Sequence, residues 1–153
     1  MQLPDVFLAL GEQSFGKLMN SVSLGKLRTY QLFDRLKTRA HLAKLNAEAL
    51  HKASPRLWAR LSEKDEEFAK DLAQAVLVSN LSMIVAVLDF LGIPNEGGFF
   101  AKDEDPKQHL KEGWQQQVFD RFRDAYPQPV LLFYINHLAW ETQPEAGIFQ
   151  PVA

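Results

Sequence analysis

Residues 62–92 read SEKDEEFAKDLAQAVLVSNLSMIVAVLDFLG, and this stretch decides the fold class. It opens with Ser62 followed three residues later by Asp65, a spacing similar to the capping box that begins many helices. Its acidic residues also suit the positive end of a helix. From Val76 onward nearly every side of the expected helix is apolar, and such a helix is enclosed by others. The stretch predicts a helix over about residues 63–91 at the centre of a bundle.

The N-terminal third of the chain also has helical periodicity. Its leucines recur at steps of three and four residues, which is the spacing of one helix face. Ser23 is a suitable cap for a helix that runs to about His51. Ser54 and Pro55 then form a cap followed by proline at the first helical position, which predicts a separate short helix.

Two more helices are expected in the C-terminal half. Asp105 and Pro106 open the first, after the turn-forming segment NEGGFFAKDEDP at 95–106. One stripe of this helix is apolar: Leu110, Trp114, Val118, Phe119, Phe122 and Tyr126. The second helix covers VLLFYINHLAWE at 130–141. This segment is rich in strand-forming residues, but no other segment alternates with a period of two to pair with it.

The sequence therefore predicts an all-α, single-domain helical bundle. We expect residues 1–153 to form five or six helices around the central apolar helix at about 63–91, with an irregular C-terminal tail at 143–153. A chain of 153 residues, 46% of them hydrophobic, is long enough to bury one core without disulfides. The absence of cysteine excludes disulfides, thiolate nucleophiles and cysteine-bound metal sites.

The charge and the chain start bear on the compartment. The net charge of −2 hides a basic half, +6 over residues 1–61, and an acidic half, −8 over residues 62–153. The first residues, MQLPDVFLAL, lack the cationic start of a signal peptide. The most apolar window, 75–93, contains Ser79, Asn80, Ser82 and Asp89, which a membrane span would not favour. We expect a cytoplasmic protein that has no membrane partner.

Histidines and glutamates supply the candidate metal ligands. Glu48 and His51 lie one helical turn apart, and His137 and Glu141 lie one turn apart on another predicted helix. If both pairs faced each other, they would form a set of two histidines and two glutamates. Such a set has fewer ligands than the di-iron sites of helical bundles but the same residue types. The alternative is a solvated surface pair at Glu48–His51 and a hydrogen-bonded core histidine at 137. We expect no cofactor.

Asp89, Phe99 and Phe100 are the candidates for contact with a ligand or a partner. Asp89 lies in the last turn of the most apolar helix, where the helix dipole disfavours an anion. Either Asp89 is an acid that lines a ligand pocket or takes part in catalysis, or it is a structural residue. In the second case it pairs with a cation of this chain or lies at a solvated helix end. The Phe99–Phe100 pair follows two glycines in a loop and either tucks into the core or is offered to a partner.

Nucleic-acid binding is the least favoured class. Arg28, Arg35 and Arg39 fall on one stripe of the predicted N-terminal helix, but three lysines fall on nearly the opposite stripe. A phosphate backbone needs its cations on one side. The chain has no phosphate-binding glycine loop and no GxSxG nucleophile motif, so no catalytic residue is assigned.

Three functions are thus left open, in this order. The first is a non-enzymatic protein that acts through protein–protein contacts or homo-oligomerisation. The second is a bundle that binds a metal or small molecule through its Glu/His pairs, with or without enzymatic activity. The third is a nucleic-acid-binding regulator that uses the basic N-terminal helix.

Overall fold

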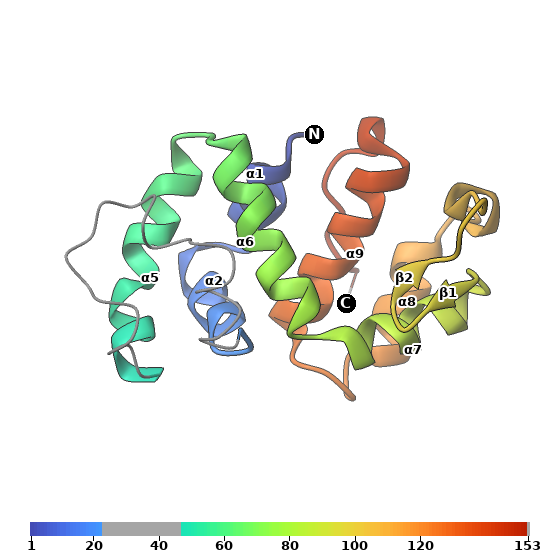
Figure 1. Cartoon of the computed structure of the whole chain (residues 1–153), viewed down its shortest axis with the longest axis horizontal. Helices are drawn as coiled ribbons and strands as arrows, with labels where there is room; N and C mark the ends of the chain where they lie inside the picture. Colours follow the sequence, from blue (N-terminus) through green and yellow to red (C-terminus); the bar gives the residue numbers. More distant parts are fainter. Residues whose placement is uncertain (23–46, 153) are drawn as a thin grey trace.

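The computed structural model describes residues 1–22 and 47–152, and nearly all of its regular structure is helical (Figure 1). This confirms the all-α fold class. The α-helices in these ranges are α1 Leu3–Leu8, α2 Glu12–Met19, α5 Ala47–Ser62, α6 Glu66–Val78, α7 Leu81–Leu91, α8 Trp114–Phe122 and α9 Gln128–Thr142. The short elements are strands β1 Asn95–Glu96 and β2 Phe99–Phe100 and the 3₁₀ helices η2 Pro106–His109 and η3 Pro144–Ala146.

The prediction of one continuous helix over 63–91 was wrong. The chain forms α6 and α7, which meet at an angle of 85°. The hydroxyl of Ser79 donates to the carbonyl of Ala75 at 2.7 Å, and the amide of Asn80 donates to the carbonyl of Val76 at 2.8 Å. Side chains that bond to the carbonyl four residues earlier compete with the backbone ladder and bend or end a helix. These two polar residues therefore divide the apolar stretch.

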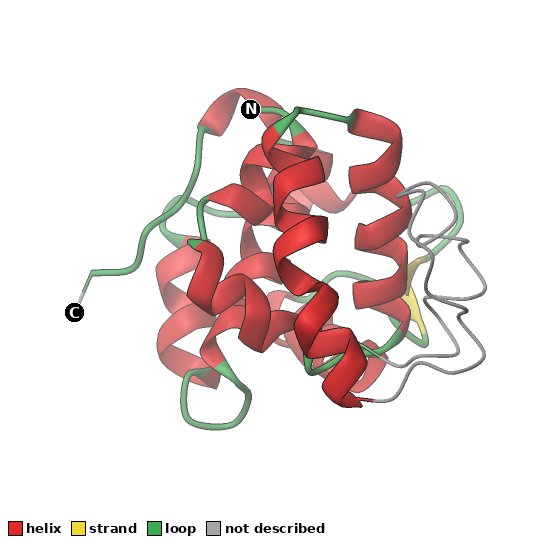
Figure 2. Cartoon of the chain, turned by 90° about the vertical axis from the view of Figure 1, so that its left-hand side faces the viewer, coloured by secondary structure: helices red, strands yellow, loops and turns green. Residues whose placement is uncertain are grey.

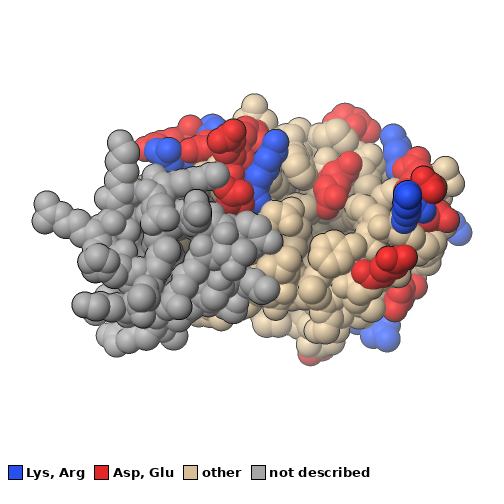
Figure 3. Space-filling model, viewed as in Figure 1, with Lys and Arg blue, Asp and Glu red and all other residues tan. Residues whose placement is uncertain are grey.

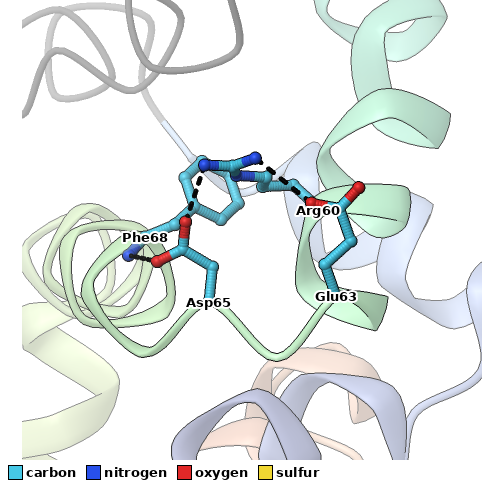
Figure 4. A network of polar contacts seen from close by, with 4 residues as sticks. All are labelled: Arg60, Glu63, Asp65 and Phe68. Atoms are coloured by element: carbon cyan, nitrogen blue, oxygen red, sulfur yellow. Dashed lines mark hydrogen bonds and ion pairs between the residues drawn. The ribbon is translucent and has the colours of Figure 1, made fainter.

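The junction between α5 and α6 also differs from the predicted cap. Ser62 ends α5, where its hydroxyl donates to the carbonyl of Trp58, and Asp65 is the cap that accepts from the backbone N–H of Phe68. Figure 4 shows the Arg60 guanidinium between the carboxylates of Glu63, at 3.1 Å, and Asp65, at 2.9 Å. Asp65 thus caps α6 and pairs with α5, which sets the turn between them.

Pro55 lies inside α5, although the sequence predicted that Ser54 and Pro55 would begin a new helix. Ser54 is buried, and a Cβ added to Gly16 of α2 would lie 3.7 Å from the Ser54 hydroxyl oxygen, in ordinary van der Waals contact. α2 and α5 pack against each other through these small residues. Packing of this kind stabilises a helix that its own proline would otherwise weaken.

The most enclosed helix is α9, not the predicted helix at 63–91. Figure 1 shows α9 between α6 and α8, and it contacts α1, α2 and α8. The Phe133 ring lies 4.7 Å from the Phe7 ring of α1, centroid to centroid. Nine consecutive or nearly consecutive residues of α9 are buried: Val130, Leu131, Phe133, Tyr134, Ile135, Asn136, His137, Leu138 and Ala139. The core of the described residues is therefore built around α9.

The helix predicted to open at Asp105 and Pro106 is interrupted. η2 ends at His109, and α8 begins only after Gly113, whose φ of 82° is left-handed and favours glycine. The apolar stripe is confirmed within α8, where Trp114, Val118 and Phe122 are buried together with Phe119.

The loop after α7 contains a small β-hairpin. Gly92 ends α7 as expected, with φ 73°, and Ile93 donates its N–H to the carbonyl of Leu88 in a Schellman-type ending. β1 and β2 pair antiparallel around Gly97 and Gly98, which both have positive φ. A two-residue turn with two positive φ values is the hairpin turn that suits the twist of strands. The turn sets the direction in which β2, with Phe99 and Phe100, runs back along α7.

The C-terminal tail contains one short 3₁₀ helix, η3, and then continues to residue 152 without regular secondary structure. Figure 2 shows this last segment on the outside of the helices. Within the described residues, no single helix is long and apolar enough to cross a membrane, and the bent pair α6–α7 passes that test only by combined length and composition.

Candidate functional site

A cleft of about 300 Å³ lies between α6, α7, the β-hairpin and α9. We call it the α6–α9 cleft. Its walls are mostly apolar and aromatic, and a few polar side chains converge on it: Lys70, Gln74, Tyr134, His137 and Glu141. Apolar walls with few polar groups are typical of small-molecule sites.

His137 and Glu141 come to this cleft from successive turns of α9. The histidine ring is buried, and its Nδ1 lies 2.8 Å from Oε1 of Glu141, whose side chain is about one-third exposed. Nδ1 has no aligned hydrogen-bond partner among the described residues. The ring packs between Phe133, at 5.7 Å, and Trp140, at 5.5 Å, centroid to centroid. A buried imidazole is thus held by aromatic packing while its polar edge faces a carboxylate.

Tyr134 lines the cleft one turn before His137. Burial raises the pKa of the Tyr134 phenol, and the negative charge of Glu141 raises this pKa further. The phenol therefore stays neutral throughout the physiological pH range. It presents the cleft with an apolar ring and a neutral hydroxyl group.

The β-hairpin forms the outer wall. A Cβ on Gly98 would lie only 3.2 Å from Cδ2 of Leu81 and 3.4 Å from Cγ2 of Ile84, so the glycine lets the hairpin approach α7 closely. Phe100 is half-buried against the core, whereas 57% of Phe99 is exposed. Phe100 is thus packed against the core, and Phe99 is exposed to solvent.

The charged side chains of the cleft are at its border. Lys70 and Gln74 of α6 are exposed, as is Glu141 of α9 on the other side. Figure 3 shows few charged side chains over the middle of this face of the molecule, near α9, while side chains of both charges gather at the end where α7 and the hairpin lie. The border of the cleft thus has one lysine and one glutamate, and the other residues that line it include no Lys, Arg, Asp or Glu.

The structure brings together four residues that the sequence suggested for separate reasons: Phe99, Phe100, His137 and Glu141. Asp89 is elsewhere. It is exposed at the end of α7, where its Oδ1 accepts a hydrogen bond from the Asn95 amide at 3.0 Å. The Asp89 carboxylate therefore lies at a solvated helix end and accepts a hydrogen bond there.

The other predicted site residues lie outside what the structure describes. Glu48 and His51 belong to α5, but their side chains are not among the described ones. Arg28, Arg35 and Arg39 fall in residues 23–46. Within the described ranges, no group of three His, Asp or Glu side chains is placed to hold a metal ion.

Sequence reasoning missed Lys70 and Tyr134, and it interpreted Trp140 as a core or interface residue first and a ligand-stacking residue second. The charged start of α6 made Lys70 look like one solvated residue among several, and the apolar character of α9 made Tyr134 and Trp140 look like ordinary core residues. A polar tip on an aromatic residue one turn from a Glu/His pair is the signal that could have indicated Tyr134. Neither a protein-family model, nor a curated protein, nor a solved structure matches this chain.

Proposed function

We propose that the protein binds a small molecule in the α6–α9 cleft, and that the ligand is a compact apolar or aromatic molecule with one amino group. The convergence of apolar walls with the His137–Glu141 pair carries the proposal. A cleft of about 300 Å³ is at the lower end of the usual range of ligand sites, which is about 300–1,000 Å³.

The amino group follows from the polar end of the cleft. Oε1 of Glu141 lies against the histidine, while the side chain remains about one-third exposed and open to a donor from the ligand. Trp140 and Phe99 border the same space, and aromatic faces attract cations. A carboxylate beside aromatic rings favours an ammonium group over a carboxylate on the ligand.

Three probes with the same ring test the proposal: 2-phenylethylamine, 3-phenylpropionate and ethylbenzene. Binding is measured by chemical-shift changes in the full chain. We expect the amine to bind tightest and the acid weakest. Glu141→Gln keeps the shape but removes the charge, and it should weaken amine binding at least about tenfold because a hydrogen bond to a charged group contributes about 1.5–3 kcal/mol. Glu145→Gln, outside the cleft on η3, is the matched control.

A second pair of variants locates the binding. Leu77→Trp should fill the cleft and weaken all three probes, whereas Leu132→Trp changes a half-buried leucine elsewhere and should not. If Leu77→Trp leaves binding unchanged, or if the acid binds as tightly as the amine, the proposal is wrong.

The exposure of Phe99 favours a second candidate function, a contact with a protein partner or another copy of the chain. A large aromatic side chain that is 57% exposed beside an apolar cleft is typical of an interaction surface. Light scattering after size exclusion, at low and high salt, tests self-association. If Phe99 forms the contact, Phe99→Ala should convert any dimer to monomer; a wild-type monomer under all conditions rules out the homo-oligomer.

A further inference from the structure

Two side-chain amides hold the last described segment of the chain, residues 147–152. On α9, Asn136 donates from Nδ2 to the Phe149 carbonyl at 3.2 Å and accepts from the Phe149 N–H at 2.7 Å. On α8, Gln116 donates from Nε2 to the Val152 carbonyl at 3.1 Å and accepts from the Val152 N–H at 2.9 Å. Each amide thus pairs with both backbone polar groups of one residue.

This pairing recognises the backbone N–H and C=O groups of an extended chain, and not its side chains. An amide that bonds to the N–H and the C=O of one residue repeats the pattern that a neighbouring β-strand would provide. Phe149 and Val152 are three residues apart, which matches the three-residue turn of a polyproline II helix, and Pro151 between them favours that conformation, as it does for Gln150 before it. α8 and α9 therefore present a two-point clamp for an extended, proline-containing segment.

The surface beside this segment is hollow and has space for a larger side chain than those of the segment itself. A hollow of about 340 Å³ opens beside Phe149, with Leu10, Pro129 and Leu132 in its walls. Ile148 and Phe149 are only half-buried, and 74% of Val152 is exposed. Gly147, with φ 76°, is the point at which the segment leaves η3. Ile148 and Phe149 pack against the core but are only partly buried, so this segment opens at lower cost than the fully buried helices.

We propose that Asn136 and Gln116 form a peptide-binding site, and that its ligand is an extended segment of a partner protein with the pattern Phe-x-Pro-Val. The chain's own residues 148–152 occupy the site as an internal competitor. The pattern comes from the resident segment: an aromatic residue at the first clamp, proline at the third position and a small aliphatic residue at the second clamp.

The test uses the full chain and a fluorescent peptide with the sequence of residues 145–153, EAGIFQPVA. Phe149→Asp weakens the internal segment without changing either clamp, and it should bind the peptide at least tenfold more tightly than wild type does. Adding Asn136→Leu to that variant should abolish binding. Val152→Pro removes only the N–H donated to Gln116 at an exposed position, so it gives a smaller gain even if Phe149→Asp does not fold.

Three further outcomes decide the matter. Amide exchange in the wild type should accelerate at Phe149 and Val152 when the peptide is added, because the internal segment is displaced. No binding to either loosened variant overturns the proposal. Light scattering that finds a wild-type dimer which the peptide dissociates also overturns it, because the occupant is then the tail of a second copy.

Discussion

Asn136 and His137 are neighbours on α9, and both residues are 3% exposed, yet the hydrogen bonding of their polar atoms differs. Asn136 faces the tail, and its amide is paired with the backbone of Phe149. His137 faces the α6–α9 cleft, and its Nδ1 has only a close contact with the Glu141 carboxylate. Because consecutive residues on a helix point about 100° apart, one helix can serve two different surfaces.

The difference separates a polar side chain that is paired with the chain's own backbone from one whose Nδ1 has no aligned hydrogen-bond partner. A buried donor or acceptor without a hydrogen bond costs about 1–3 kcal/mol. On the tail side this cost is avoided, because the Asn136 amide is hydrogen-bonded to the backbone of Phe149. On the cleft side it does not, and a buried imidazole that lacks an aligned partner beside an open cleft is the reason to look for a ligand there.

Asn136→Leu is expected to give the largest effect, and His137→Leu is the substitution with which it is compared. Asn136→Leu leaves the N–H and C=O of Phe149 without their partner and should lower the free energy of unfolding by about 1–3 kcal/mol. His137→Leu replaces a ring whose Nδ1 has no aligned hydrogen bond by an apolar side chain, and should cost less than about 1 kcal/mol. Urea unfolding measures both. Equal losses for the two variants would contradict the comparison.

The second prediction concerns alkaline stability on the cleft side. Burial raises the pKa of Tyr134, so above the pKa of a free tyrosine, about 10, the unfolded chain releases this proton while the folded chain retains it. Stability therefore falls as the pH rises, by about 1.4 kcal/mol at pH 11 for this residue. Between pH 8 and pH 11, the free energy of unfolding of Tyr134→Phe should therefore fall by about 1.4 kcal/mol less than that of wild type. An identical decrease in both proteins would show that Tyr134 ionises freely.

The smallest effect is expected at an exposed pair away from both faces of α9. Lys64, before α6, forms an ion pair and hydrogen bond with Asp5 of α1, and this contact lowers the pKa of Asp5. Because both side chains are at least about one-third exposed, Asp5→Asn should cost less than about 1 kcal/mol at pH 7.

The sign of the Asp5 effect gives its pH dependence. A lowered pKa stabilises the fold above the pKa of a free aspartate, about 3.9, and this contribution disappears as the pH falls through the folded value. The difference between wild type and Asp5→Asn should therefore vanish in acid and shrink at high salt. A difference that persists at pH 2 would mean that the hydrogen bond, and not the charge, is responsible.

The fold class was predictable because it depends on local patterns. The helix at 130–141 was predicted in spite of its strand-forming residues, since no second segment could pair with it, and α9 covers it fully. The break between α6 and α7 was not predicted. Ser79 and Asn80 are compatible with either a continuous or a divided helix, and Asn80 also donates to Ser21, 59 residues away, which only the folded chain brings close.

The candidate site was predictable in its parts but not in its assembly. The glycine pair indicated that Phe99 and Phe100 were unusual, and the one-turn spacing indicated His137 and Glu141. Their meeting in one cleft depends on the direction of the hairpin, which the close approach of Gly98 to Leu81 determines. No local pattern contains that distance.

The sequence by itself determined the all-α class, the end of a helix at Gly92 and the turn-forming segment that contains Gly97 and Gly98. These features depend on hydrogen bonds and backbone conformations within a few residues of each other. The tertiary structure alone decided that α9 is the enclosed helix, and that its two adjacent polar residues serve different surfaces. That choice depends on which helices cover each side of α9, and such packing is a property of contacts between residues far apart in the chain.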